Sequence, residues 1–119
     1  MSYYAIELVP GADAEPFDQV LQLDGSKYLF RFRWAARASA WLLSIHDDQD
    51  VELIAGLALV NTSDLLRPFN DERLPPGQLS VVDVDGTGLD AGKADLGGRV
   101  QMFYVNNETV AEVEAELAA

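Results

Sequence analysis

The fold is decided by residues 24–47, which read DGSKYLFRFRWAARASAWLLSIHD. From Tyr28 to Trp34, aromatic side chains occupy every second position and alternate mostly with cations. A period of two places successive side chains on opposite faces of a β-strand, so this segment has an apolar face and an arginine face. We predict strands at 27–34 and 40–46 that build a core and present polar contacts, rather than an active site.

The rest of the chain repeats this pattern in short segments between turns. Alternation and apolar runs predict strands at 3–8, 17–23, 27–34, 40–46, 51–60, 79–84 and 99–105. Asp24-Gly25 is a strong hairpin signal between the second and third strands. The predicted fold is therefore mainly all-β, a small antiparallel β-barrel or sandwich of about seven strands with a short C-terminal helix.

The C-terminal residues differ in character from the rest. Thr109 and Glu112 fit the capping-box pattern that begins a helix. Val110, Val113 and Leu117 are predicted to share one face of this acidic helix, which packs on the sheet or orders on a partner. We therefore divide the chain into a β-domain at 1–107 and an acidic helical tail at 108–119.

Residues 61–77 follow neither the strand nor the helix period, apart from one helical turn expected at Ser63 to Leu66. Connections of this length in compact domains are usually functional or disordered. Because Leu65, Leu66, Phe69 and Leu74 are apolar, we expect this segment to dock onto another surface rather than to be disordered.

Composition excludes several classes of function. The chain has 119 residues, no cysteine and a net charge of −12, so disulfides and thiolate chemistry are absent. A phosphate backbone would be repelled by most of such a surface, so no specific nucleic acid is expected as a partner. No apolar run reaches the roughly 18 residues of a membrane helix, and the first residues do not resemble a signal peptide. We expect no membrane partner and synthesis in a cytoplasm.

The motifs for catalysis and metal binding are incomplete. His46 adjoins Asp47, but no motif supplies a nucleophile, and the last residue of a strand is expected to be exposed. Calcium-loop positions one, three, five and six are matched by Asp83, Asp85, Thr87 and Gly88. The glutamate required at position twelve is replaced by Ala94. We predict no enzyme and no cofactor, and a small-ligand or calcium-binding β-barrel is the alternative.

Three of the eight basic residues cluster on the predicted ribbon at Arg31, Arg33 and Arg37. Arginine forks suit bidentate contacts to carboxylates at interfaces. The competing interpretation is pairing with acidic side chains of the same sheet. Both interpretations remain open.

Four groups of motifs occur in order along the chain: LDG at 23–25 with YLFRFRW at 28–34, WLLSI at 41–45, DLL at 64–66 followed by LPPGQL at 74–79, and DLGGRV at 95–100 with Tyr104. This ordered set resembles the baseplate plug family of contractile-tailed bacteriophages. The chain departs from the family pattern at Ala35-Ala36, where a polar pair is expected.

The resemblance implies a structural component of the virion tail baseplate that plugs or lines the hub at the tail-tube axis. It implies contacts with hub, tube, spike and tape-measure proteins. It also implies a homo-oligomer made in the host cytoplasm, expected to be a trimer on a trimeric hub, while six copies would match a tube ring. The expected interface residues are Arg31, Arg33, Arg37, Leu65, Leu66, Phe69, Val110, Val113 and Leu117. A strongly acidic chain also suits a channel that DNA crosses without sticking.

Overall fold

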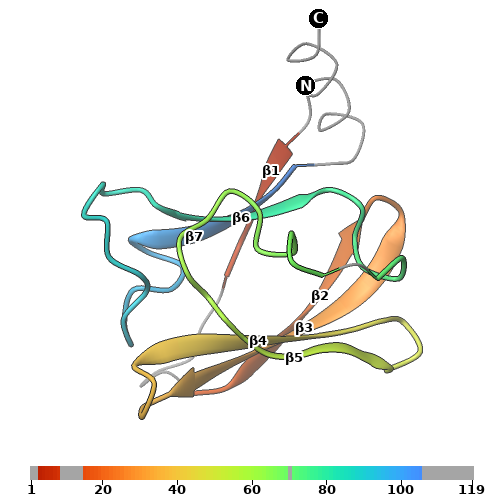
Figure 1. The fold of residues 1–119 in the computed structure, drawn as a ribbon, viewed down its shortest axis with the longest axis horizontal. Helices are drawn as coiled ribbons and strands as arrows, with labels where there is room; N and C mark the ends of the chain where they lie inside the picture. The colour runs from red at the N-terminus through yellow and green to blue at the C-terminus, as the bar shows by residue number, and fades with distance from the viewer. Residues whose placement is uncertain (1–2, 9–14, 70, 106–119) are drawn as a thin grey trace, which may run out of the picture.

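The computed structural model describes residues 3–8, 15–69 and 71–105 of the chain. It contains seven strands arranged in two layers (Figure 1). They are β1 (Tyr3–Ile6), β2 (Phe17–Leu23), β3 (Ser26–Ala35), β4 (Ala40–His46), β5 (Glu52–Ala58), β6 (Gln78–Asp83) and β7 (Val100–Val105). The prediction of seven strands is confirmed, and the predicted bounds differ from these by at most two residues.

The strands form two antiparallel sheets. One sheet has the order β2-β3-β4-β5 and the other has the order β1-β7-β6. The prediction left a barrel and a sandwich open, and the described residues form a sandwich with no closed barrel. The chain leaves the four-stranded sheet after β5 and starts the second sheet only at β6, so no ladder joins the two layers.

The hairpin between β2 and β3 has the predicted turn. Leu23 pairs with Ser26, which leaves Asp24 and Gly25 as a two-residue loop. Both residues have positive φ, 49° and 82°. This is the backbone of a turn whose twist matches that of the flanking strands, and Asp-Gly adopts it at little cost.

The aromatic face of β3 fills the space between the layers. Tyr28, Phe30 and Phe32 are buried, as is Trp41 on β4, while Trp34 is partly buried. The ring of Phe32 stacks on Phe17 of β2 with centroids 4.7 Å apart. The opposing sheet contributes side chains that are also fully buried, namely Leu79, Val81, Val100, Met102 and Tyr104. The interior is packed with side chains, as the alternation predicts.

One hydrogen-bonded group joins the two sheets and the loop before β6. The hydroxyl of Tyr104, on β7, donates to the carboxylate of Asp24 in the β2–β3 turn. The same hydroxyl accepts the backbone N–H of Gly77 at 2.8 Å. Tyr104 is fully buried, so these bonds form away from water, where an unmade hydrogen bond is costly.

The segment 61–77 runs along the free edge of β6. Thr62 forms a bridge with Val81, and the N–H of Leu65 donates to the carbonyl of Leu79. The expected helical turn at Ser63 to Leu66 is wrong. The Asp64 carboxylate accepts the N–H of Leu66, and this side-chain bond favours a turn over a helix.

Two statements about the C-terminal part of the chain remain predictions. They are the division into 1–107 and 108–119 and the C-terminal helix. Residues 106–119 lie outside the described residues.

Replacing Gly77 with alanine should destabilise the sandwich by about 3 kcal/mol, at the upper end of ordinary single substitutions. A Cβ at this position would lie 2.1 Å from the carbonyl oxygen of Val105 and 2.7 Å from the Tyr104 hydroxyl. Urea unfolding followed by tryptophan fluorescence measures the loss. The matched control is Gly98→Ala, whose added Cβ would meet only an ordinary contact at 3.7 Å. Equal stability of the two variants would contradict this account of the junction.

Candidate interaction surfaces

The arginine face of β3 lies on the outer side of the four-stranded sheet. Arg31 is half exposed, pairs across the strands with Asp18 and Ser44, and forms an ion pair with Asp18 at 3.5 Å. For Arg31 the pairing within the sheet is therefore present. Arg33 and Arg37 are exposed, and among the described residues neither has an ion pair. Their role at an interface remains a prediction.

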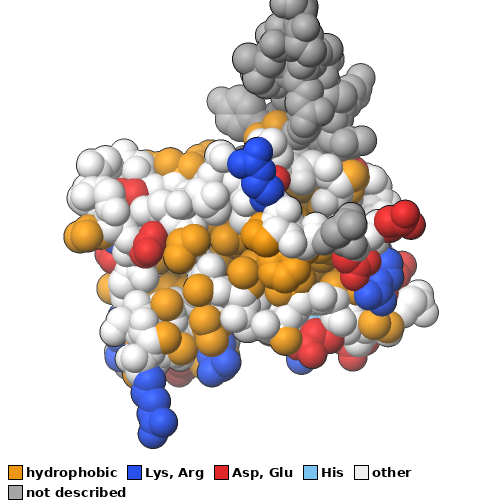
Figure 2. All heavy atoms as spheres, in the orientation of Figure 1, with side chains coloured by type: hydrophobic (Ala, Val, Ile, Leu, Met, Phe, Trp, Pro, Cys, Tyr) orange, Lys and Arg blue, Asp and Glu red, His pale blue; other side chains and the backbone are white. Residues whose placement is uncertain are grey.

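The three apolar residues predicted to dock from the 61–77 segment differ in exposure. Leu65 and Leu66 are buried in this chain's own core, whereas Phe69 is 38% exposed. Phe69 lies beside a hollow of 470 Å³ with Leu66, Leu74 and other residues of the same segment. Figure 2 shows hydrophobic side chains gathered between the two layers on the face that carries this segment. Of the three, only Phe69 offers its side chain to a partner, and that role remains a prediction.

Val110, Val113 and Leu117 lie outside the described residues. Their predicted role in an interface remains a prediction.

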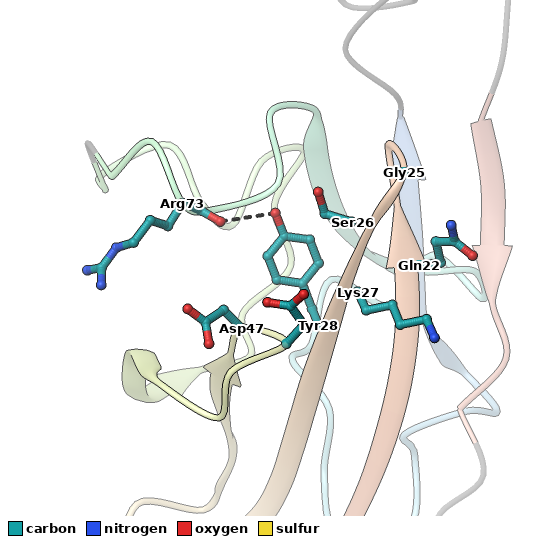
Figure 3. Close-up of a pocket in the computed structure, with 8 residues that line it drawn as sticks. Gln22, Gly25, Ser26, Lys27, Tyr28, Asp47 and Arg73 are labelled. Atoms are coloured by element: carbon teal, nitrogen blue, oxygen red, sulfur yellow. Dashed lines mark hydrogen bonds between the residues drawn. The ribbon is translucent and has the colours of Figure 1, made fainter.

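A second hollow, of 560 Å³, lies at the β2–β3 turn and is lined by Lys27, Tyr28, Asp47, Asp48 and Arg73, among others. The Tyr28 hydroxyl points toward the Arg73 backbone and donates to its carbonyl at 3.0 Å (Figure 3). Burial raises the pKa of this hydroxyl, and the Asp24, Asp47 and Asp48 carboxylates add to the rise, while a hydrogen bond with Ser26 opposes it. Tyr28 therefore stays protonated and acts as a structural donor.

The segment that resembles a calcium loop is organised by an arginine. The Arg99 guanidinium lies 3.1 Å from the Asp83 carboxylate and 2.9 Å from that of Asp95. It also donates to the Thr87 hydroxyl and to the carbonyls of Leu89 and Asp90, each at 2.9 Å. A guanidinium thus occupies the place beside Asp83 that a bound cation would take.

The Asp83 carboxylate accepts several further hydrogen bonds. They come from the Thr87 hydroxyl and from the N–H groups of Asp85 and Gly88. The Thr87 bond, followed by these N–H groups and Arg99, lowers the pKa of Asp83 to about 2. Arg99 also lowers the pKa of Asp95. This network fixes the conformation of the 84–99 segment.

His46 differs from its expected exposure. It is 9% exposed and stands between Leu29 of β3 and Glu52 of β5 in the sheet register. Its Nδ1 lies 3.6 Å from the Asp50 carboxylate, too far for a direct hydrogen bond. The Asp47 carboxylate accepts the N–H groups of Gln49 and Val51 in its own turn. The prediction of an exposed His46 is wrong because neighbouring strands flank it on both sides.

Two structural findings concern ions and membranes. Among the residues that the structure describes, no three His, Cys, Asp or Glu side chains gather to hold a metal ion. In the same part of the chain, no helix has the length and apolar character to cross a membrane.

Sequence reasoning missed Arg99 and Tyr104 as organising residues. The sequence shows both only as parts of motifs, because alternation predicts which face of a strand a residue lies on and not which side chains it contacts. Tyr104 contacts Asp24, which lies 80 positions earlier in the chain. Arg99 comes directly after Gly97-Gly98, a turn signal that gave no sign of the carboxylates it meets.

The described residues thus form a filled β-sandwich with a self-paired charged network around Arg99 and with Arg33 and Arg37 exposed. Residues 3–108 match the family described as "Cyanophage baseplate Pam3 plug gp18", and the chain belongs to this phage baseplate plug family. This confirms the resemblance recognised from the sequence and is consistent with a structural role in a tail baseplate. No individually curated protein matches the chain.

Substituting Asp83 with asparagine should remove a pH-dependent part of the stability. Because the folded pKa of Asp83 is about 2 and its ordinary value is near 3.8, the ionised carboxylate stabilises the fold above about pH 4. This stabilisation is lost as the pH falls toward 2. The difference in unfolding free energy between the wild type and Asp83→Asn should therefore shrink between about pH 4 and pH 2.

Urea unfolding at a series of pH values measures this difference. Asp85→Asn is the matched control, because the Asp85 side chain is exposed and has no ion pair among the described residues. A difference between Asp83→Asn and the wild type that stays constant across this range would refute the role assigned to the Asp83 carboxylate.

Proposed function

We propose that this chain is a non-enzymatic structural component of a phage tail baseplate that plugs or lines the hub at the tail-tube axis. The observation that carries the proposal is the match to the baseplate plug family over residues 3–108. Its partners are the hub, tube, spike and tape-measure proteins of the tail. It is made in the host cytoplasm and acts in the virion as several copies, expected to be three.

The packing of the molecule supports a structural role. Ligand sites are usually concave, largely apolar cavities with a few convergent polar groups. Here the space between the sheets is filled by aromatic and aliphatic side chains. The densest polar cluster, around Arg99, is satisfied by bonds within the chain. These features favour assembly over catalysis or ligand storage.

The charge of the chain supports a position along the path of DNA. The net charge is −12, and like charge keeps a nucleic acid from adhering to a surface. The exposed Arg33 and Arg37 and the exposed Phe69 are suited to protein contacts. We assign them, with Arg31 and the tail residues Val110, Val113 and Leu117, to contacts with neighbouring tail proteins.

Deletion of the gene from the phage should leave tails that lack a complete baseplate, and supplying the wild-type chain should restore them. Supplying Phe69→Ser should restore tails poorly, because the variant removes an exposed aromatic contact without opening the core. Electron microscopy and infectious titre of the complemented lysates measure the effect.

Val84→Ser is the matched control, since Val84 is 49% exposed and lies outside the proposed contacts. Normal tails in the deletion strain would contradict the proposed function. Full restoration by Phe69→Ser would remove Phe69 from the interface.

A further inference from the structure

We infer that the two ends of the four-stranded sheet join copies of this chain head to tail. In this arrangement the turn between β3 and β4 of one copy is seated against the turn between β4 and β5 of the next. The inference rests on the proposed function for the presence of several copies, and it names the surface that joins them. The two ends of the sheet are complementary in charge and in shape.

The receiving end is a hollow of 240 Å³ with an apolar floor and an acidic rim. Val20, which is 70% exposed, and Leu29 lie in it together with Asp47, Asp48 and Asp50. Lys27 also lines the hollow, so one cation stands beside three carboxylates. This combination suits a cation carried on a long apolar stem, because the stem covers the floor and the charge meets the rim.

Two of the three rim carboxylates are available to a partner. Asp47 is engaged by the N–H groups of its own turn. Asp48 is exposed and has no ion pair or hydrogen bond among the described residues. Asp50 is also exposed, and the Nδ1 of His46 lies 3.6 Å from its carboxylate. The exposed carboxylates of the rim can therefore bind a guanidinium group of a partner.

The inserting end is the turn at residues 36–39. Backbone bonds from Ala38 to Ala35 and from Ser39 to Ala36 hold this turn. Arg37 is exposed at its tip between Ala36 and Ala38, whose small side chains leave it free to enter a hollow. In the space-filling view, basic side chains project at the lower left, beneath the end of the sheet where β3 turns into β4 (Figure 2).

The two ends cannot satisfy each other within one molecule. The β3–β4 turn precedes the seven residues of β4 and the acidic turn follows them, so they lie roughly 20 Å apart along the strand (Figure 1). Different patches on the two copies make the contact heterologous, and such contacts close into a ring when the rotation between copies allows. A second copy is the favoured occupant because the chain itself carries the complementary cation.

Charge reversal tests this contact in the full chain. Sedimentation velocity at about 0.15 M salt, where long-range repulsion is screened beyond about 8 Å, should show concentration-dependent association of the wild type. Arg37→Glu and Asp48→Arg should each raise the dissociation constant about tenfold or more. The double variant Arg37→Glu/Asp48→Arg should regain most of the lost affinity, because it re-creates an attractive pair with opposite signs.

Arg67→Glu is the matched control, because Arg67 is exposed but lies at neither end of the sheet, and it should associate as the wild type does. Unchanged melting temperatures establish that the variants fold. A wild type that stays monomeric up to about 1 mM, or a double variant as weak as the single ones, overturns the inference. If that happens while purified tails contain the chain, only this inference fails. If the chain associates but is absent from tails, the proposed function fails.

Discussion

The burial of one aromatic face of the β3–β4 ribbon is the constraint on which the rest of the structure depends. Phe30, Phe32 and Trp41 are almost completely buried, and truncating such a side chain typically costs about 3–5 kcal/mol. A single sheet would leave that aromatic face exposed to water, so a second layer is required to bury it. β1, β6 and β7 supply it, and the Tyr104 hydroxyl fixes that layer to the β2–β3 turn.

This constraint also shapes the outer surface. Because the aromatics of β3 point inward, the alternate residues Leu29, Arg31 and Arg33 point outward. The charged ends of the same sheet then come from its turns, which are free of core packing. An arginine turn and an aspartate turn thus lie at opposite ends of a sheet whose inner face, in the part of the chain that the structure describes, is packed with aromatic and aliphatic side chains.

Local patterns in the sequence were sufficient to predict the strands but not to predict which segments pack against one another. Alternation and Asp24-Gly25 predicted the ribbon, its turn and the filled interior. They left a barrel and a sandwich open, because the choice depends on which edges meet across distant parts of the chain. The burial of His46 was missed because its position between β3 and β5 depends on strand pairing, which alternation does not report. Arg99 carried no periodic signal, although it organises the 84–99 segment.

The family match concerns the kind of assembly, and the packing concerns how the residues of this chain form a stable domain. The family match supports a baseplate structural role, and the filled sandwich gives a small acidic chain a packed two-layered body suited to that role. A reconstruction of the intact tail by electron cryomicroscopy tests this most directly. The account predicts density for the two-layered sandwich at the baseplate hub, on the tail-tube axis. Density elsewhere in the particle, or tails that lack the chain altogether, would contradict it.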